Sequence, residues 1–207
     1  MLLKLDKMKI EFLKDKIEIK NKKITNLDKF VIDFTSILNK EKIEYVIVSG
    51  YLTILFGRNR TSEDVDIIVS KINDKSFEKL WNKIIKDYDC VITSDFNNAF
   101  DNYLLKDTSI RFAKKETFIP NIEFKFPKFE IDEWTLNERK KVIIDKHEIY
   151  ISPLEIQIPY KLFLGSEKDI EDAKFLYNLF RNNIDIEIFN EFNNKFKTKE
   201  LFIRYIK

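Results

Sequence analysis

The chain has 207 residues, a length that suits one domain or a core with a small appendage. Hydrophobic residues make up 44% and charged residues 35%, which is enough apolar material for a folded core beneath a charged surface. The net charge is only +2, so the composition does not indicate a general nucleic-acid binder, whose affinity rests on a surplus of lysine and arginine.

The single cysteine and the single histidine restrict the kinds of metal site that the chain can build. Cys90 has no second cysteine with which to form an intrachain disulfide, and zinc sites made of several cysteines or histidines are excluded. Carboxylates remain as ligands, and oxygen ligands suit Mg²⁺ or Mn²⁺. No stretch approaches the ~18 apolar residues that span a bilayer, and residues 1–20 carry too many charges for a signal peptide. We therefore expect a cytoplasmic protein without a membrane partner.

The first predicted elements alternate between helix and strand. Residues 1–24 are rich in lysine with interspersed apolar residues, and they suit either a helix or a hairpin. A helix follows, because apolar residues recur with the 3.6-residue period across residues 27–38. Thr25 and Asp28 resemble a capping box at its start. The apolar run of residues 43–49 then predicts a strand buried on both faces.

The next elements surround a polar loop. Gly50 ends the first strand, and residues 51–56 predict a short helix that Gly57 closes. Beyond the loop, residues 64–69 predict a second strand. Residues 74–88 predict an amphipathic helix, because their large apolar side chains fall on one side of it.

The middle of the chain has a weaker pattern. Residues 91–110 are mixed, with a strand expected near Val91. Two short strands are predicted at residues 110–112 and 122–126. Two apolar runs then predict a hairpin across residues 141–151.

The remainder of the chain is predicted to be helical. Pro153 suits a first helical position with Ser152 as its cap, and Pro159 is expected to kink or restart that helix. Ser166 is expected to cap the next helix, and apolar residues between positions 184 and 196 predict one or two more.

This order of elements predicts an α/β or α+β core with a C-terminal helical part. We divide the chain into an N-terminal segment of undetermined structure, a core and a helical part. Their bounds are residues 1–24, 25–151 and 152–207.

The polar loop and its flanks carry the most informative residues. Glycine is rare, with only 3 in the chain, and Gly50 and Gly57 bracket the short predicted helix. Gly50 stands where a buried strand turns into a helix. A glycine there lets the backbone approach a ligand and present N–H groups to phosphate oxygens. The alternative is an ordinary tight turn.

Asp64 and Asp66 stand two residues apart on the second predicted strand, so both side chains point to the same face, about 7 Å apart. The strand is otherwise apolar, and unpaired carboxylates are costly in a buried strand. A metal ion beside the pair explains them better than chance placement on a polar edge. Asp64 follows Gly50 by fourteen residues, which allows the loop to fold back and bring phosphate and metal together.

These features resemble the nucleotidyltransferase superfamily, and most closely its AbiEii-like and related stand-alone members. Those proteins often read Gly-Gly-Tyr-Ala, then His-Gly, then Arg-x-Thr-x-Asp-Ile-Asp. Here the corresponding residues are Ser49-Gly50-Tyr51-Leu52, Phe56-Gly57 and Arg60-Thr61-Ser62-Glu63-Asp64-Val65-Asp66. Ser49 replaces the first glycine, and one extra residue lies between Thr61 and Asp64. The resemblance implies a mixed sheet flanked by helices, with backbone contacts to phosphate at Ser49, Gly50 and Tyr51 and a cationic contact from Arg60.

A second, weaker motif of the same group lies in the helical part. Lys161 follows the Pro-Glu helix start, and Lys168-Asp169-Ile170-Glu171-Asp172 resembles the Arg/Lys-Asp-x-x-Asp stretch. The resemblance implies that Lys161 and Asp172 take part in nucleotide binding. The alternatives are that Asp169 completes the Ser166 cap and that Lys168 and Asp172 form a surface pair.

The fold of this group also implies a third carboxylate on a later strand beside the aspartate pair. Glu123 is our choice, because Asn121, Glu123 and Lys125 form the polar face of a strand that is otherwise apolar. Glu130 and Asp132 are the competitors.

The resemblance implies a metal-dependent enzyme that moves a nucleoside monophosphate from a nucleoside triphosphate to an acceptor and releases pyrophosphate. Asp64, Asp66 and Glu123 would be the catalytic and Mg²⁺- or Mn²⁺-binding residues. The acceptor is RNA, a protein or a small hydroxyl compound. Stand-alone relatives often act as toxins, so an antitoxin is an implied partner. The alternatives are a degenerate member that binds a nucleotide or a protein partner without transfer, and a domain with two fortuitous acids.

Overall fold

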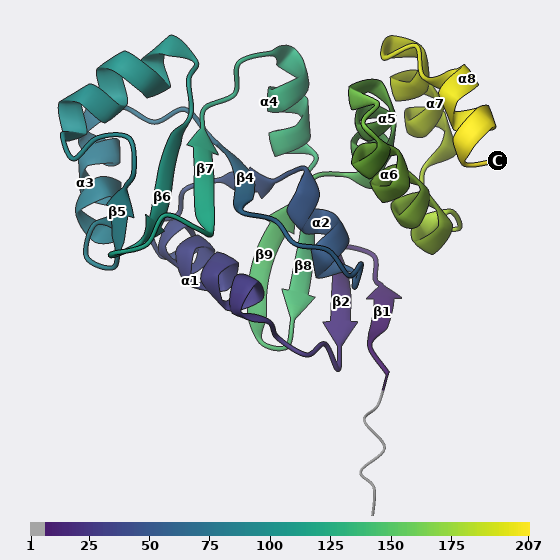
Figure 1. Cartoon of the computed structure of the whole chain (residues 1–207), viewed down its shortest axis with the longest axis horizontal. Helices are drawn as coiled ribbons and strands as arrows, with labels where there is room; N and C mark the ends of the chain where they lie inside the picture. Colours follow the sequence, from purple (N-terminus) through teal and green to yellow (C-terminus); the bar gives the residue numbers. More distant parts are fainter. Residues whose placement is uncertain (1–6) are drawn as a thin grey trace, which may run out of the picture.

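A computed structural model of the chain describes residues 7–207 and contains a nine-stranded mixed sheet flanked by helices (Figure 1). Parallel pairs join β2 to β8, β9 to β3 and β4 to β7, and the other neighbours are antiparallel. In spatial order the strands are β1 (Lys9–Phe12), β2 (Lys16–Lys20), β8 (Lys140–Ile144), β9 (His147–Ile151), β3 (Tyr45–Ile47), β4 (Asp64–Val69), β7 (Asn121–Lys125), β6 (Ile110–Lys114) and β5 (Tyr88–Cys90). This architecture confirms the predicted fold class.

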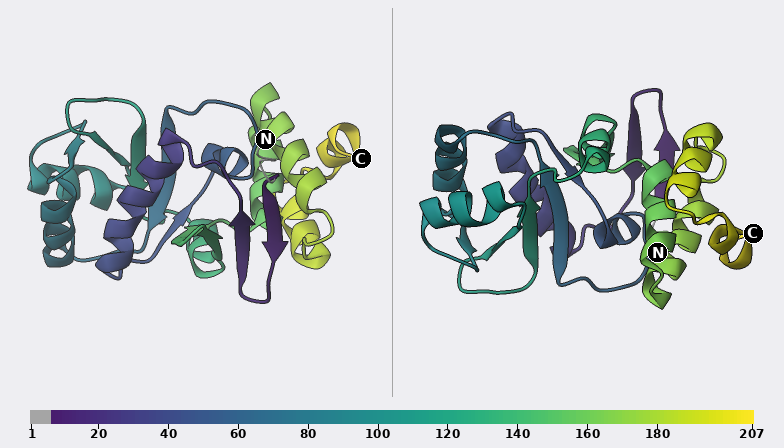
Figure 2. Two further views of the ribbon diagram at one scale, coloured as in Figure 1. Left: turned by 90° about the horizontal axis from the view of Figure 1, so that it is seen from below. Right: turned by 90° about the horizontal axis from the view of Figure 1, so that it is seen from above.

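The helices cover the sheet and form the C-terminal part. In chain order they are α1 (Asn26–Lys40), α2 (Gly50–Leu55), α3 (Asp74–Ile84), α4 (Glu130–Asn137), α5 (Leu154–Leu164), α6 (Glu167–Phe180), α7 (Ile186–Lys195) and α8 (Lys199–Tyr205). Figure 2 shows α5–α8 gathered at one end of an elongated molecule, with α3 at the other end. Within residues 7–207, no helix combines the length and apolar character needed to cross a membrane.

The N-terminal segment is a hairpin rather than a helix in its described part. β1 and β2 pair antiparallel, with Ile10 opposite Ile19. β2 then runs parallel to β8, with Ile17 beside Val142. Alternate residues of β2 are buried, which is the period-2 pattern of a strand with one face on the core.

Helix α1 begins at the predicted capping box. Thr25 Oγ1 accepts a hydrogen bond from the Asp28 amide, and Asp28 Oδ2 accepts one from the Thr25 amide, at 3.1 and 2.8 Å. The Asp28 carboxylate is fully buried and also accepts from Lys22 Nζ and the Tyr51 hydroxyl, at 2.7 and 2.8 Å. Burial favours a higher pKa for Asp28, but the Lys22 and Thr25 hydrogen bonds and the Lys22 charge outweigh it and lower that pKa.

We expect Asp28→Asn to destabilise the protein at neutral pH by about 1–3 kcal/mol, because the Lys22 ammonium loses its anionic partner. The unfolded chain binds the Asp28 proton more readily than the folded chain, so this stabilisation is present above about pH 4 and is lost as pH falls through the lowered folded pKa. Urea unfolding of both proteins between pH 7 and pH 3 measures the effect. A stability difference that stays constant down to pH 3 would contradict it.

Aromatic residues form the core between the sheet and the helices α1 and α3. Tyr88 packs edge-on against Phe34 with ring centroids 5.2 Å apart, and Trp81 packs against Phe112 at 5.7 Å. The predicted helix 74–88 was too long, since α3 ends at Ile84 and Tyr88 begins β5. Tyr88 is buried. A buried aromatic residue fits the end of a helix as well as the start of a strand, so the sequence pattern could not separate the two.

The start of α5 differs from the prediction. α5 begins at Leu154 with Pro153 as its N-cap, because the Ser152 amide extends the sheet by bonding the Ile47 carbonyl at 2.9 Å. Glu155, in the first turn of α5, accepts a hydrogen bond from the Asp185 amide at 3.0 Å. α5 also runs through Pro159 without restarting, where packing against α6 and α7 offsets the missing helical hydrogen bond. Ser166 caps α6 as predicted.

Two helical segments were not predicted. α4 follows β7 and begins where Asp132 Oδ2 accepts from the Lys128 and Phe129 amides, both at 3.0 Å. Residues 98–106 form a π-helical turn, η1 (Asn98–Tyr103), followed by the 3-10 turn η2 (Leu104–Lys106). Both segments are short, and a period of 3.6 residues is hard to detect over so few positions.

Candidate active site

The three carboxylates predicted from the sequence lie on one face of two neighbouring strands. Asp64 and Asp66 alternate along β4, and β7 runs parallel beside it. Glu123 pairs in register with Asp66, and Asn121 pairs with Asp64. Residues in register on adjacent strands share a face, so the structure places Glu123 beside Asp66, where the third carboxylate was expected. Glu130 and Asp132 lie on α4 instead.

The pKa of Asp66 is raised by its surroundings. Burial, with the neighbouring charges of Glu123 and Asp64, raises the pKa of the Asp66 carboxyl, while Lys125 opposes this rise. Glu123 has a partner of its own, since Arg111 on β6 donates to its carboxylate at 3.1 Å. Like charges held together in this way favour a cation between them.

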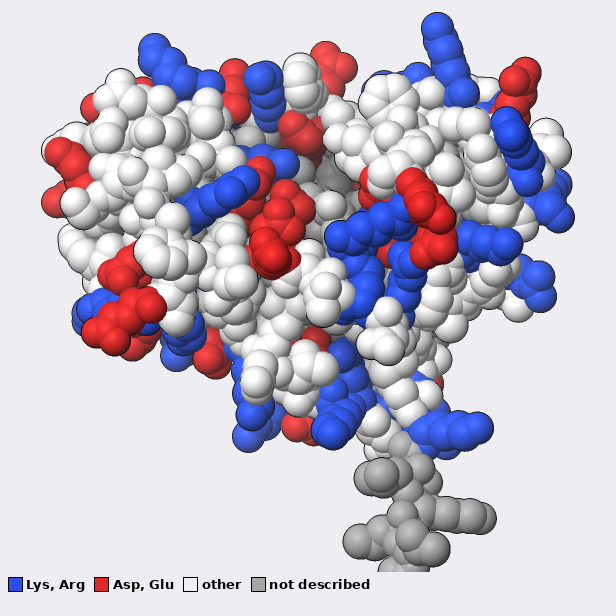
Figure 3. All heavy atoms as spheres, viewed as in Figure 1, with Lys and Arg blue, Asp and Glu red and all other residues white. Residues whose placement is uncertain are grey.

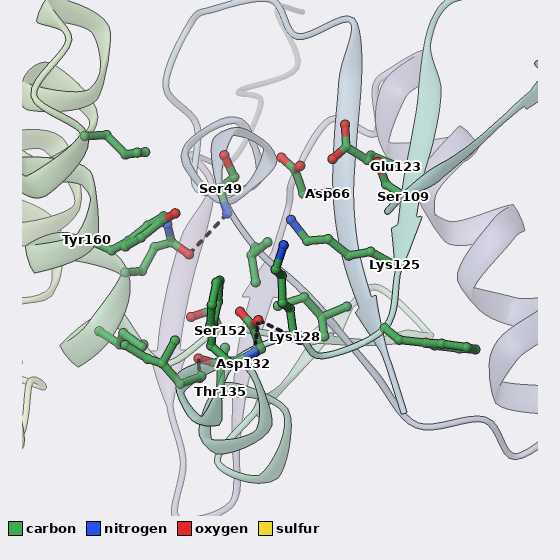
Figure 4. Close-up of a pocket in the computed structure, with 18 of the residues that line it drawn as sticks. Ser49, Asp66, Ser109, Glu123, Lys125, Lys128, Asp132, Thr135, Ser152 and Tyr160 are labelled. Atoms are coloured by element: carbon green, nitrogen blue, oxygen red, sulfur yellow. Dashed lines mark hydrogen bonds between the residues drawn. The ribbon is translucent and has the colours of Figure 1, made fainter. Parts of the chain in front are cut away.

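A cavity of about 700 Å³ opens in front of this face and is shared by the sheet, α4 and α5. Asp66, Glu123, Lys125 and Ser49 line it, and Figure 4 shows their side chains directed toward one region. Figure 3 shows the molecule hollowed between the sheet half and the C-terminal helices, with acidic and basic side chains beside the hollow. The volume is that of sites that bind small molecules.

Ser49 turns the chain from β3 into α2 at the edge of this cavity. Its backbone has φ 63° and ψ −134°, a conformation that side chains make unfavourable and glycine tolerates. Its amide donates to Gln157 Oε1 of α5 at 3.1 Å. This backbone conformation gives a physical reason why a glycine stands at the matching position of the resembling motif.

Replacing Ser49 with glycine is expected to stabilise the protein by about 1 kcal/mol. Relief of a strained backbone is worth about 1–3 kcal/mol, and the greater freedom of glycine in the unfolded chain takes back about 0.4–1 kcal/mol. Urea unfolding measures the change. Ser49→Ala is the matched control, because alanine also loses the hydroxyl but keeps the strain, and a glycine variant no more stable than the alanine variant would contradict the expectation.

Gly50 and Arg60 lie against each other. A Cβ atom at Gly50 would stand 2.9 Å from Arg60 Nη2, so a larger residue would displace the guanidinium. Tyr51, the next residue, is fully buried, and its hydroxyl is bound to Asp28. Its side chain is therefore used by the fold, and the predicted phosphate contact of Tyr51 would fall to its backbone.

Arg60 also belongs to a buried ion cluster centred on Asp172. The Asp172 carboxylate is fully buried and is bound by Arg58, Arg60 and Lys161, the last at 2.7 Å. Lys161 is itself buried and contacts Asp169 at 3.4 Å. The alternative interpretation, a surface pair between Lys168 and Asp172, does not hold, because the partners of Asp172 come from α5 and from the loop before β4.

Lys161 and Asp172, which were predicted to contact the nucleotide, are both members of this ion cluster. Neither residue lines the cavity, and their charges satisfy each other. The cluster instead ties the C-terminal helices to the loop that leads into Asp64. A direct contact of either residue with phosphate stays a prediction. Asp169 does complete the Ser166 cap, as predicted.

Lys125 and Lys128 are cavity residues that the site prediction omitted. Lys125 lies on the same face of β7 as Glu123, and Lys128 follows three residues later, before α4. Figure 4 shows both ammonium groups directed toward the region in front of Asp66. Their positions suit contacts with phosphate oxygens. The alternation of Asn121, Glu123 and Lys125 was the signal that could have identified the first of them.

The donor set fits Mg²⁺ or Mn²⁺. Within residues 7–207, no three histidine, cysteine, aspartate or glutamate side chains converge into a complete metal site. Mg²⁺ does not need one, because it is commonly held by one or two carboxylates together with substrate phosphates and water. Asp64 and Asp66 supply hard oxygen ligands on one face of β4. Burial first, and then the charges of Glu123 and Asp64, raise the pKa of Asp66, and a bound cation would stabilise its ionised form.

Comparison with known proteins gives matches by structure but not by sequence. No protein-family model and no curated protein matches the chain. An antigenic nucleotidyltransferase-like protein from Paracoccidioides brasiliensis matches over 86% of this chain and 90% of its own, with 17% identity and a TM-score of 0.53. The antibiotic-resistance factor ANT(2'')-Ia matches over 87% of this chain and 97% of its own, with 8% identity and a TM-score of 0.53. At such low identities these structural matches show a shared fold and no more, and they confirm the predicted resemblance at that level.

Proposed function

Since the chain has the fold of the nucleotidyltransferase superfamily, we propose that it is a metal-dependent nucleotidyltransferase. The observation that carries the proposal is the register of β4 and β7, which sets Glu123 beside Asp66 and on the same face as Asp64. The cavity in front of Asp66 and Glu123 has room for a nucleotide. Asp64 and Asp66 would hold Mg²⁺, with Glu123 as a further ligand or as a base.

The proposed reaction moves a nucleoside monophosphate to an acceptor hydroxyl. The hydroxyl oxygen attacks the α-phosphorus, the bond from that phosphorus to the bridging oxygen breaks, and pyrophosphate leaves. Glu123 would accept the hydroxyl proton, for which its contact with Arg111 must loosen. A bound Mg²⁺ would neutralise charge on the phosphates. Lys125 and Lys128 would hold phosphate oxygens, and the Gly50 backbone would lie close to them.

A second candidate is a protein that binds a nucleotide without transferring it. Lys125 supports this alternative, because its positive charge lowers the pKa of Asp66 against the rise that burial causes. A resident ammonium group beside a carboxylate competes with a metal ion for the same negative charge. The two candidates agree on nucleotide binding and differ in whether label reaches an acceptor.

The test is transfer of label from α-³²P-labelled ATP, GTP, CTP and UTP with Mg²⁺. Total RNA, total protein and a set of small hydroxyl compounds serve as acceptors, with the Asp64→Asn/Asp66→Asn double variant as control. Label that requires the two aspartates establishes transfer and identifies the acceptor class. Labelled RNA or protein would justify a search for toxicity and for an antitoxin. Mg²⁺-dependent nucleotide binding without label transfer would favour the second candidate. If neither binding nor transfer is detected, both candidates are rejected and only the fold assignment stands.

A further inference from the structure

Helix α5 exposes large apolar side chains on the face that looks into the cavity. Tyr160, Phe163 and Leu164 are 40%, 57% and 48% exposed, and their spacing places them on one side of the helix. The other side of α5 packs against α6 and α7. Large apolar side chains on a helix face normally pack against another element, and none covers this side of α5 among the described residues.

The exposed rings are joined by a third from α7. Phe196, which follows the last residue of that helix, lies with its ring centroid 5.6 Å from those of both Tyr160 and Phe163. Tyr160 and Phe163 are stacked at 6.2 Å with an angle of 29° between their planes. Phe196 in turn stacks on the buried Phe192 at 6.1 Å. The three side chains form a wall of aromatic surface that is anchored to the helical part.

This aromatic wall and the carboxylates belong to the same cavity. Tyr160, Phe163 and Phe196 line it together with Asp66 and Lys125. Figure 4 shows Tyr160 on the side of the cavity opposite Asp66 and Lys125, with Ser49 and its hydrogen bond to Gln157 between them. The cavity thus has a polar side suited to phosphate and metal and an aromatic side suited to a flat ring. Nucleotides combine those two chemistries, and bases stack on aromatic side chains irrespective of sequence.

We propose that Tyr160, Phe163 and Phe196 form a stacking subsite for a nucleobase. This subsite rests on the proposed function, which supplies two sources for the base: the triphosphate and a nucleotide of an RNA acceptor. Lys125 and Lys128 lie in the same cavity and complement the phosphates that accompany either source. The aromatic wall sits on the C-terminal helices, so these helices contribute to recognition as well as to the fold.

The test is a calorimetric comparison of three probes on the full chain: Mg²⁺–ATP, Mg²⁺–tripolyphosphate and hexaadenylate. Phe163→Leu keeps an apolar side chain but removes the flat ring, and it is expected to weaken binding of ATP or of hexaadenylate by about 5-fold or more. Tripolyphosphate, which has no base, should bind unchanged. Phe163→Trp should retain the wild-type affinity. Ile203→Ala on α8, which removes an exposed apolar residue outside the cavity, is the control.

Each outcome decides the proposal. A loss confined to ATP assigns the base to the triphosphate, and a loss confined to hexaadenylate assigns it to the acceptor. Equal affinities for Phe163→Leu and wild type, or no binding of either base-containing probe to wild type, would overturn the subsite. Label transfer that continues with unchanged affinities would leave the proposed function standing without the subsite. Binding that depends on Phe163, without label transfer by the wild-type protein, would support the subsite and reject the proposed transfer.

Discussion

Replacing Asp66 with asparagine is expected to lower the rate of nucleotidyl transfer by more than about 100-fold. Residues that only orient metal ligands change affinity or activity by about 10–100-fold when mutated, and Asp66 is proposed as a ligand itself. The amide of asparagine has no charge with which to hold Mg²⁺ against the competing ammonium of Lys125. Asp64 alone would then remain on β4, and the ion would lose its place beside Glu123.

The folded state should not suffer from this substitution. Burial and the charges of Glu123 and Asp64 raise the pKa of Asp66, so its ionised form is unfavourable where it stands. A neutral amide relieves that repulsion, and the variant should unfold at the same or a higher urea concentration. Initial rates with the labelled nucleotide and acceptor, beside urea unfolding, measure both effects. Asp101→Asn, an exposed aspartate outside the cavity, is the matched control. A rate within a few-fold of wild type would remove Asp66 from the proposed mechanism.

The common face of Asp64, Asp66 and Glu123 could be predicted largely because strands have a simple period. Asp64 and Asp66 had to share a face once residues 64–69 were a strand, and Glu123 had to alternate with buried Ile122 and Phe124. That the two strands are neighbours did not follow from periodicity, since pairing joins residues far apart in the chain. The resemblance to a known fold supplied that neighbour relation, and the register bears it out.

The residues whose partners lie far away in the chain were harder to predict. Asp172 has the spacing of a helix-surface pair with Lys168, and nothing local indicates that Arg58 and Arg60 reach it. Tyr51 was predicted to contact phosphate through its backbone, and nothing local indicated that its hydroxyl binds Asp28, which precedes it by 23 residues. Such contacts depend on how elements pack, and a hydrophobic or charged residue is compatible with several packings.

Asp172→Ala is expected to destabilise the protein by about 3–5 kcal/mol, the usual cost of removing one partner from a buried ion pair. Lys161 is fully buried, and without Asp172 its ammonium would keep only the 3.4 Å contact with Asp169. Arg58 and Arg60 are less enclosed and can turn partly toward water. Urea unfolding measures the loss. Glu171→Ala is the matched control, because Glu171 pairs with Arg58 from an exposed position and should contribute no more than about 1 kcal/mol.

A double variant separates unpaired charge from general disruption of α6. Lys161→Met in the Asp172→Ala background removes the buried ammonium, so it should recover part of the lost stability, although each single change destabilises the protein. Recovery would show that the cost arises from the stranded charge. A double variant less stable than Asp172→Ala would mean that Asp172 acts by packing alone. If Arg60 keeps its place against Gly50 only through Asp172, nucleotide affinity should also fall in Asp172→Ala under conditions where the protein remains folded.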